Sequence, residues 1–333
     1  MSNLESGQRP GGATALHVII PAGGAGTRLW PLSRARKPKF LLDLLGEGAS
    51  LLEATVLRLT KLAASISIVT GAAHEEAVAG QMQRLRREGL IPKDLPLEIV
   101  VEPSGRDSMP AIGLACSLIA ARYGAEAVVG AFAADHAIGD QGAFLTAVQA
   151  AMVAAKEGYV TTIGIRPTSP STAYGYIEPS DQWVTARARR AQQFVEKPPL
   201  GIAKRYVADG FLWNAGMFVM QVGSVISGLA TFQPELGEGL ERIQELWPPR
   251  AGTGATIDEI WNSLPRISID HALAEPLAKR GKVATAVMKG SKWTDLGDFA
   301  SLAETERAPD PAKEHVVIDS PGSMVHVPAK KAA

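Results

Sequence analysis

The stretch that decides the fold is LHVIIPAGGAGTRLW, residues 16–30. It opens with a short apolar run, residues 16–20, which has the length and character of a buried strand. Gly23, Gly24 and Gly26 follow almost at once, and glycines at that density end a strand and open a loop. We therefore expect a buried strand that leads directly into a glycine-rich loop.

Similar strands recur through the first half of the chain. Apolar runs at residues 66–70, 97–101 and 127–133 are separated by longer segments with helical character. Strands that alternate with helices predict right-handed crossovers and a parallel sheet. Ligands of such sheets bind beyond the carboxyl ends of the strands, so the loops after Ile20 and Ala133 are the predicted place for a site.

Two of the intervening segments carry helix signals. Ser50 followed by Glu53 forms a capping-box pattern, which predicts a helix that runs through Leu59. Met82 and Leu85 stand among three arginines, a spacing that favours a surface helix with one apolar face.

The second half of the chain has a different pattern. From about residue 164, short strands punctuated by proline and glycine are predicted at 174–178, 193–196 and 217–220. We expect this part to be an insertion that covers the edge of the sheet. The predicted organisation is a disordered tail at 1–14, a domain at 15–305 with halves at 15–163 and 164–305, and a C-terminal extension at 306–333. Whether residues 316–327 form a short β-segment that pairs two subunits into a homodimer is left open.

The composition excludes several classes of partner. Lys and Arg total 34 and Asp and Glu also total 34, so no overall field draws the chain to nucleic acid or to an acidic membrane. No apolar run reaches the roughly 18 residues that span a bilayer, and no signal-type stretch opens the sequence. Cys116 is the single cysteine, which fits a reducing compartment. We expect a cytoplasmic protein.

The glycine loop is consistent with phosphate binding but matches neither of two common motifs. Glycines let backbone N–H groups close on phosphate oxygens, because no Cβ stands in the way. The dinucleotide fingerprint requires a third glycine where Leu29 stands, and the P-loop requires Lys then Ser or Thr after its last glycine, where Thr27 and Arg28 stand. A plain turn remains the alternative.

A local cluster of cations favours the phosphate interpretation over a solvated basic loop. Pro31 and Pro38 argue against a simple amphipathic helix in this region. Arg28 is suited to grip β- and γ-phosphates as a fork, and Lys39 offers a compact charge to the α-phosphate and to departing pyrophosphate. Five cations fall within residues 28–39: Arg28, Arg34, Arg36, Lys37 and Lys39.

The string PAGGAGTRLWPLSRARKPK, residues 21–39, closely resembles the signature of the GDP-mannose pyrophosphorylases, that is, the mannose-1-phosphate guanylyltransferases. The resemblance continues in family order through most of the chain. Its further blocks are EPSGRDSMPAIGLA (102–115), FAADH (132–136), YGYIEP (174–179), FVEKP (194–198), WNAGMF (213–218), SIDHALAE (268–275) and WTDLGDF (293–299).

The resemblance implies an α/β fold with a Rossmann-like, mixed and mostly parallel sheet, helices on both faces and a small C-terminal segment. It implies the reaction of GTP with mannose 1-phosphate to give GDP-mannose and pyrophosphate, with Mg²⁺ as cofactor. The resemblance assigns metal binding to the positions that match Asp135 and Asp295. Magnesium prefers a few carboxylates together with phosphate oxygens and water. From the sequence alone each is a turn or helix-cap aspartate, and only the blocks reverse that interpretation. Asp298 is predicted to cap the last helix.

The resemblance places the nucleotide against the loop and the end of the third strand. Glu102 ends that strand, and its carboxylate, which accepts hydrogen bonds only, suits the N1–H and amine donors of guanine. A solvent-exposed strand-end glutamate is the alternative, and Arg106 and Asp107 are expected to pair or to cap a helix. The implied nucleotide-binding residues are Ala22, Gly23, Gly24, Gly26, Thr27, Arg28, Glu102 and Ser108.

For the sugar phosphate, the resemblance points to the second half of the chain. Lys197 is the expected partner of the sugar phosphate, and Trp213 or Tyr176 is an expected apolar wall. Taken singly, Glu196 and Lys197 form an exposed pair in the alternative interpretation. Asp270 and His271 are expected by default to cap a helix. His136 is expected to have a structural role. The positions that match the family's hexose 1-phosphate pocket are Gly175, Glu178, Glu196, Lys197 and Asn214.

The implied mechanism is in-line attack by a mannose 1-phosphate oxygen on the α-phosphorus of GTP, without a covalent intermediate or a general base. Arg28, Lys39, Asp135 and Lys197 are the implied catalytic residues, which act by alignment and charge neutralisation. The alternatives are the same chemistry with glucose 1-phosphate and UTP or dTTP, and a non-catalytic sugar-nucleotide sensor. Bifunctional relatives carry a further isomerase domain, for which we expect no room in these 333 residues.

Overall fold

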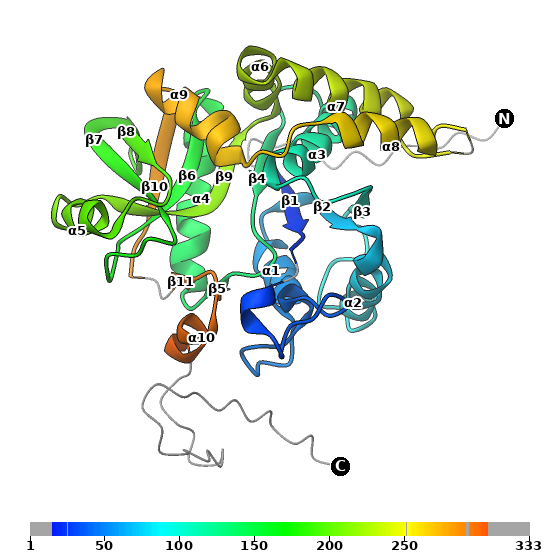
Figure 1. Cartoon of the computed structure of the whole chain (residues 1–333), viewed down its shortest axis with the longest axis horizontal. Coiled ribbons are helices and arrows are strands. Elements are labelled where there is room, and N and C mark those ends of the chain that lie inside the picture. Colours follow the sequence, from blue (N-terminus) through cyan, green and yellow to red (C-terminus); the bar gives the residue numbers. More distant parts are fainter. Residues whose placement is uncertain (1–14, 25, 251, 291–292, 306–333) are drawn as a thin grey trace, which may run out of the picture.

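The computed structural model describes residues 15–24, 26–250, 252–290 and 293–305, and it is built on one nine-stranded sheet (Figure 1). The strand order is β3-β2-β1-β4-β9-β6-β10-β8-β7. Its strands are β1 Leu16–Ala22, β2 Ala63–Gly71, β3 Leu97–Glu102, β4 Val128–Ala131, β6 Val160–Ile165, β7 Gly175–Thr185, β8 Ala188–Val195, β9 Leu212–Gln221 and β10 Val283–Met288.

The strand predicted from residues 16–20 is confirmed as β1, at the centre of a parallel group. It pairs with β2 on one side and β4 on the other, and β3 pairs with β2. Its side chains alternate between two cores: Val18 and Ile20 lie in one and Ile19 in the other. The predicted strand at 127–133 is shorter as β4, although the Phe132 N–H still donates to the Ile19 carbonyl at 2.9 Å. An apolar run therefore predicts a strand buried on both faces.

Helices cover both faces of this parallel group, as predicted (Figure 1). One core is closed by α1, α2 and α4, and the other by α3, α6, α7 and α8. The capping box that starts α1 is confirmed, because the Ser50 hydroxyl accepts from the Glu53 N–H and the Glu53 carboxylate accepts from the Ser50 N–H. The helices are α1 Leu51–Leu59, α2 Glu75–Arg87, α3 Ser108–Tyr123, α4 Gln141–Lys156, α5 Leu200–Ala208, α6 Val222–Phe232, α7 Pro234–Leu246, α8 Gly254–Ser263, α9 Glu275–Lys279 and α10 Phe299–Thr305, with 3-10 turns η1 Thr27–Leu29, η2 Lys39–Leu41 and η3 Ala72–His74 and a π-helical turn η4 Asp270–Ala274.

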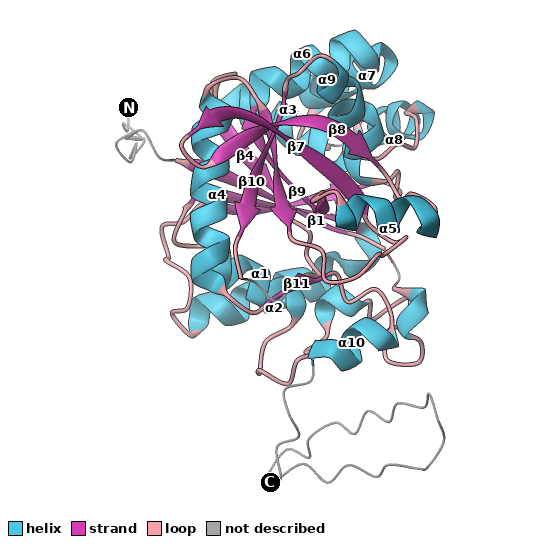
Figure 2. Ribbon diagram, turned by 90° about the vertical axis from the view of Figure 1, so that its left-hand side faces the viewer, coloured by secondary structure: helices cyan, strands magenta, loops and turns pink. Residues whose placement is uncertain are grey.

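The second half covers the β4 edge of the parallel group, as predicted, and does so by continuing the sheet. Strand β9 runs antiparallel to both β4 and β6, which joins the two halves side by side. Strands β6, β10, β8 and β7 follow in order, and β7 then pairs with β9 again, through Gly175 and Asn214 among others. Five strands therefore close into a ring, and Figure 2 shows β7 and β8 arching over β9 and β10. The predicted mixed sheet is confirmed, but it is not mostly parallel: four pairs, within β3-β2-β1-β4 and between β6 and β10, are parallel and five are antiparallel, because the second half adds mainly antiparallel strands.

A second, two-stranded sheet lies beyond the ends of the central strands (Figure 2). Strand β5, Ala137–Ile138, pairs antiparallel with β11, Trp293–Thr294. Asp298 then caps α10, as predicted, by accepting from the Ser301 N–H at 2.9 Å. This small sheet brings the segment after β4 against a segment about 150 residues further along the chain.

The predicted tails, residues 1–14 and 306–333, and the possible β-segment at 316–327 lie outside the described residues. Among the residues that are described, no helix combines the length and the apolar character required to cross a bilayer.

Candidate active site

A cleft of about 300 Å³ opens at the carboxyl end of β1, where the sequence predicted a site. Its walls come from the glycine loop, η1, η2, the segment after β4 and the turn before α10. It is lined by Gly23, Gly24, Gly26, Thr27, Arg28, Lys39, Asp135 and Gly297. All of these except Gly297 are predicted nucleotide or catalytic residues, brought together from separate parts of the chain, and Ala22 lies buried at the end of β1 beneath them.

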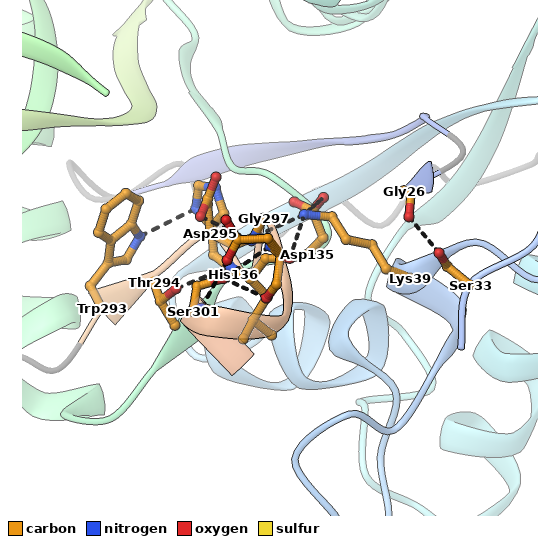
Figure 3. Close-up of polar contacts among 12 residues, drawn as sticks. Gly26, Ser33, Lys39, Asp135, His136, Trp293, Thr294, Asp295, Gly297 and Ser301 are labelled. Carbon is orange, nitrogen blue, oxygen red and sulfur yellow. Dashed lines mark hydrogen bonds and ion pairs between the residues drawn. The ribbon is translucent and has the colours of Figure 1, made fainter. Parts of the chain in front are cut away.

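The glycine loop has a backbone that side chains would obstruct. Gly24 and Gly26 have φ values of 87° and 58°, in the left-handed region that glycine adopts without strain. A Cβ added to Gly26 would lie 3.2 Å from Lys39 Cγ, so loop and lysine are in close contact. The Ser33 hydroxyl donates to the Gly26 carbonyl and fixes the loop from outside (Figure 3).

Lys39 is held by oxygen atoms on the side of the cleft opposite the glycine loop (Figure 3). Its Nζ forms an ion pair with Asp135 Oδ2 at 2.9 Å and donates to the Asp295 carbonyl at 2.7 Å and the Leu296 carbonyl at 3.3 Å. The side chain is only 13% exposed. The ammonium therefore joins the segment after β4 to the turn that contains Asp295.

The Asp295 turn is tight and is shaped by its own side chain. Leu296 has a φ of 47°, and the Gly297 N–H donates to Asp295 Oδ1 at 3.1 Å. Tyr174 donates its hydroxyl to the same oxygen, also at 3.1 Å. A Cβ on Gly297 would lie 3.1 Å from Asp295 Oδ2 and 3.3 Å from Arg28 Nη1, so carboxylate and guanidinium converge on this glycine.

A second, smaller cavity of about 140 Å³ adjoins the first, at the closure of the five-stranded ring. The same two segments contribute to both cavities. Asp135 lines the first and the next residue, His136, the second; Gly297 lines the first and Asp295, two residues before it, the second. The lining of the second is His136, Ala173, Tyr174, Gly175, Glu196, Asn214, Ala215, Gly216, Asp270, Trp293 and Asp295.

Asn214 organises the floor of the second cavity. Its Oδ1 accepts from the Thr162 hydroxyl at 2.7 Å and from the Gly216 N–H at 3.1 Å, and its Nδ2 donates to Asp270 Oδ1 at 2.8 Å. A Cβ added to Gly175 would lie 2.5 Å from Glu196 Oε2, so the two predicted residues are in contact. With Asp295, three carboxylates and an amide thus surround one small polar space.

Asp270 opens η4, but it does not cap that turn, so its default capping role is wrong. Its carboxylate faces the cavity and accepts from Asn214. Burial, reinforced by the charge of Glu196, raises the pKa of Asp270 to about 6. The π-helical geometry of η4 is common at functional sites. Ser268, which accepts weakly from the His271 N–H at 3.4 Å, is the nearest approach to a cap at this end.

Lys197 and Glu196 form the pair that the sequence left open. Lys197 Nζ lies 2.8 Å from Glu196 Oε1, and this hydrogen bond raises the pKa of Lys197. The Lys197 side chain is 62% exposed, whereas that of Glu196 is 15% exposed. Lys197 has a φ of 46°, a strained conformation for a residue other than glycine. Glu178 lies further along β7, half-buried, and lines neither cavity.

Glu102 is buried at the end of β3, behind the glycine loop, so the solvent-exposed alternative is wrong. A Cβ on Gly23 would lie 3.9 Å from Glu102 Oε1, and Oε2 has no hydrogen-bond partner among the described residues. Burial raises the pKa of Glu102 to about 7. Ser108 opens α3, where its hydroxyl accepts from the Ile269 N–H at 3.0 Å.

The loop between Glu102 and α3 is tied to the segment after α8. Asp107 caps α3 by accepting from the Ser108 N–H, one of the two roles predicted for it. Arg106 does not pair with it but donates to the carbonyls of Asn262 and Leu264.

Sequence reasoning missed the aromatic side chains of the second cavity. Trp213 and Tyr176, the expected apolar walls, are buried and do not line it, whereas Tyr174 and Trp293 do. Burial lowers the pKa of His136, which lines the same cavity and accepts from the Trp293 indole N–H at 3.4 Å (Figure 3). No sequence pattern separates Tyr174 from Tyr176, because residues two apart share the same alternation along a strand.

The mixed sheet, its glycine loop and the paired cavities define an α/β protein with the sugar nucleotidyltransferase fold. Residues 17–309 match the nucleotidyl transferase family, which is most of the chain. The chain belongs to this family.

Two curated relatives are similar to most of the chain. The chain is 37% identical over 298 residues to the xanthan biosynthesis protein XanB of Xanthomonas campestris pv. campestris, which is 89% of this chain and 61% of that protein. It is 35% identical over 296 residues to mannose-1-phosphate guanylyltransferase of Escherichia coli K12, 87% of this chain and 59% of that protein. The chain thus spans about three fifths of these relatives.

A solved structure supports the same fold. The structure described as mannose-1-phosphate geranyltransferase from Thermus thermophilus superposes with a TM-score of 0.72 at 32% identity. The superposition covers 87% of this chain and 78% of that one.

Proposed function

We propose that the protein transfers GMP from GTP to α-D-mannose 1-phosphate, with release of pyrophosphate and with Mg²⁺ as cofactor. The observation that carries the proposal is the pair of adjoining cavities, whose common wall is formed by residues 135–136 and 295–297. One cavity has the glycine loop and two cations, and the other has three carboxylates and an amide. A triphosphate and a sugar phosphate bound in them would meet at that wall.

The larger cavity has the features that a triphosphate requires. Backbone N–H groups of Gly23, Gly24 and Gly26 are free of Cβ obstruction, and Arg28 offers a planar fork of donors. Lys39 adds a compact charge, although in the free protein it is paired with Asp135. Binding of the nucleotide therefore requires Lys39 to exchange a carboxylate for phosphate oxygens or to serve both.

The residues present fit a magnesium ion that arrives with the nucleotide. No group of three or more His, Cys, Asp and Glu side chains gathers anywhere in the described ranges, so the chain supplies too few ligands for a closed metal site. Asp135 and Asp295 would hold the ion together with phosphate oxygens and water, the ligand set that Mg²⁺ favours. When bound, the ion would neutralise charge on the α-phosphate.

The smaller cavity suits a hexose. Glu196, Asp270 and Asn214 offer acceptors and a donor to hydroxyl groups, and Gly175 leaves room for the ring. Lys197, whose side chain is largely exposed beside Glu196, is the cation available to the 1-phosphate. Its charge reduces the repulsion between the two anionic substrates.

The proposed chemical step requires no proton transfer. An oxygen of the sugar 1-phosphate, already anionic, forms the new bond to the α-phosphorus as the bond to the bridging β-phosphate oxygen breaks. Pyrophosphate leaves with that electron pair. Arg28, Lys39 and Lys197 contribute by alignment and by neutralising charge, the largest effects in transfers of this kind.

Guanine selectivity is assigned to Glu102. Its ionised carboxylate would accept from guanine N1–H and the exocyclic amine, and the unpartnered Oε2 is the atom available for this. An amide at this position would present a donor as well and would lose that discrimination.

The test is release of pyrophosphate from each of four nucleotides, GTP, ATP, UTP and dTTP, with mannose 1-phosphate and with glucose 1-phosphate. Fastest release from GTP with mannose 1-phosphate is expected. Release from UTP or dTTP with glucose 1-phosphate alone would replace the substrate assignment, and no release from any pair would defeat catalysis. We infer a cytoplasmic location, consistent with the single buried thiol of Cys116. A homodimer stays a prediction.

A further inference from the structure

We propose that Tyr174 is a positioning residue for Asp295, so that its phenol sets the orientation in which this carboxylate binds the metal ion. The inference rests on the proposed function, because Asp295 is a metal ligand only within it. The observation is the hydrogen bond of 3.1 Å from the Tyr174 hydroxyl to Asp295 Oδ1, across 121 residues of sequence.

The two oxygens of Asp295 have different surroundings. Oδ1 accepts two hydrogen bonds, from the Tyr174 hydroxyl and from the Gly297 N–H, both at 3.1 Å. Both oxygens lie about equally near the position of a Gly297 Cβ, Oδ2 at 3.1 Å and Oδ1 at 3.2 Å, so the hydrogen bonds are what distinguish them. Two donors on one oxygen satisfy its lone pairs and leave the other oxygen for a cation. Partners of this kind orient carboxylate ligands and tune their metal affinity.

Gly297 alone cannot fix this orientation. Its N–H is two residues from Asp295 and moves with the same turn, which contains the strained Leu296. Tyr174 immediately precedes β7 in the five-stranded ring, a part of the structure separate in sequence from the turn. The Tyr174 hydrogen bond therefore fixes the Asp295 carboxylate relative to the five-stranded ring, whereas the Gly297 N–H fixes it only relative to its own turn.

The Tyr174 ring is itself held on two sides. It packs edge-on against Trp213 at 5.0 Å and against Trp293 at 5.1 Å, measured between ring centroids. Burial and the neighbouring Asp295 charge raise the pKa of the phenol, so it remains a donor across the neutral range. A donor held by its own neighbours in the ring can fix the Asp295 carboxylate relative to that ring.

Tyr174 also adjoins the proposed sugar cavity. It lines that cavity with Asp295, and the next residue, Gly175, pairs with Asn214 and contacts Glu196. The same strand end thus borders the sugar phosphate and orients the metal carboxylate. Tyr174 is proposed to act through Asp295, not on the reacting atoms.

The strand provides a matched control. Tyr176 is two residues away in β7 and also donates one phenolic hydrogen bond, but to the Ser171 carbonyl at 2.9 Å. Its side chain is fully buried and lines neither cavity. Tyr176→Phe therefore removes a comparable bond without contact to Asp295.

The experiment measures Mn²⁺ affinity by electron paramagnetic resonance, with the full chain and GTP present and no sugar phosphate. Tyr174→Phe is expected to weaken Mn²⁺ binding roughly tenfold, in the range typical of lost partners of metal ligands. Tyr176→Phe is expected to leave Mn²⁺ binding unchanged. In steady-state assays, Tyr174→Phe should raise the magnesium concentration for half-maximal rate, whereas Tyr176→Phe should leave it unchanged.

Asp295→Asn separates the two possible failures. If Asp295→Asn weakens Mn²⁺ binding and Tyr174→Phe does not, the positioning role is wrong and the metal assignment stands. If Asp295→Asn leaves Mn²⁺ binding intact, the metal assignment is wrong and the positioning role fails with it. If both weaken it, the double variant should bind no more weakly than Asp295→Asn alone, because the phenol acts only through that carboxylate. Additive losses would overturn the proposal.

Discussion

The parallel group β3-β2-β1-β4 and the five-stranded ring β9-β6-β10-β8-β7 form one sheet but present their polar residues differently. In the parallel group, strands end at one edge, and the site residues follow those ends in loops. In the ring, the polar residues lie within strands or beside them, where β7 closes on β9. The first arrangement suits a long polyphosphate that lies across loops, and the second suits a compact ligand held on several sides.

The difference indicates that the ring binds the sugar phosphate and the parallel group binds the nucleotide, while the common wall serves both. Substitutions in the ring are expected to change the KM for the sugar phosphate, and those behind the glycine loop the KM for GTP. Substitutions in the wall formed by residues 135–136 and 295–297 are expected to change turnover. A ring substitution that changes the KM for GTP would break this comparison.

The largest effect is expected at the wall. Asp135→Ala removes the carboxylate proposed for the metal and releases the Lys39 ammonium, so turnover should fall about 1000-fold. Asp140→Ala is the control, because Asp140 caps α4 through the Ala143 N–H and lines neither cavity. That variant should lose about 1 kcal/mol of stability and keep its turnover. Near-normal turnover in Asp135→Ala, measured by pyrophosphate release, would refute the metal assignment.

How much the sequence predicts follows the same division. The strand at residues 16–20 and the α1 capping box are local signals, and both were predictable from residue order alone. The closure of β7 on β9 pairs Gly175 with Asn214, 39 positions apart, and no local pattern encodes such a pairing. That the second half covers the sheet edge was therefore predictable, but its closure into a ring was not.

The site was predictable only in part, because its contacts are distant in sequence. Arg28 and Lys39 follow from charge near the glycine loop, but Asp135 and Asp295 were separated from ordinary turn aspartates only by resemblance. The small sheet of β5 and β11 is what joins them, and each of its strands is two residues long. The Tyr174 contact with Asp295 gave no sequence signal, since a hydroxyl bond across 121 residues has no periodicity.

A next, smaller effect is expected within the ring. Gly175→Ala places a Cβ 2.5 Å from Glu196 Oε2 and 3.3 Å from Asn214 Cβ, so the carboxylate must move. The KM for mannose 1-phosphate should rise roughly 10- to 100-fold, the scale of misplaced binding groups. The KM for GTP should not change. Steady-state kinetics with each substrate varied in turn would decide, and equal changes in both KM values would contradict the division.

The control for this change is another glycine of the second half. Gly201 lies in α5, and a Cβ there meets nothing within 4 Å. Gly201→Ala should leave both KM values unchanged and stabilise the protein by up to about 1 kcal/mol, since alanine favours helix.

Lys197→Ala should have a more modest effect, because the side chain is 62% exposed and solvent screens its charge. The KM for mannose 1-phosphate should rise roughly tenfold, equivalent to one charge-assisted contact. Lys204→Ala, an exposed lysine of α5, should change nothing. If Lys197→Ala raises the KM for GTP and not the KM for mannose 1-phosphate, Lys197 contacts the nucleotide. The division between the two regions would then be wrong.

Glu102 lies behind the glycine loop, so a substitution there sharpens the comparison from the nucleotide side. Glu98, in the same strand, is its control: Glu98 pairs with Arg122 at 2.7 Å, whereas Glu102 Oε2 has no partner among the described residues. Glu98→Gln loses that ion pair, so it should gain no stability at high pH and keep its affinity for GTP.

The smallest effect is a dependence on pH. Burial raises the pKa of Glu102 from 4.5 to about 7, so the folded state favours the protonated carboxyl and loses stability as pH rises through that window. Glu102→Gln removes this penalty. Its free energy of unfolding should therefore exceed the parent's by about 1–3 kcal/mol at pH 8 and should equal it below pH 4.5. The parent's KM for GTP should rise as pH falls below 7, because the protonated carboxyl accepts guanine donors less well, whereas the variant's KM should be high at every pH. Thermal unfolding measures the stability and steady-state kinetics the KM for GTP, each between about pH 5 and 8. If the parent's KM for GTP does not change with pH, Glu102 does not recognise the base, and its buried charge accounts only for the change in stability.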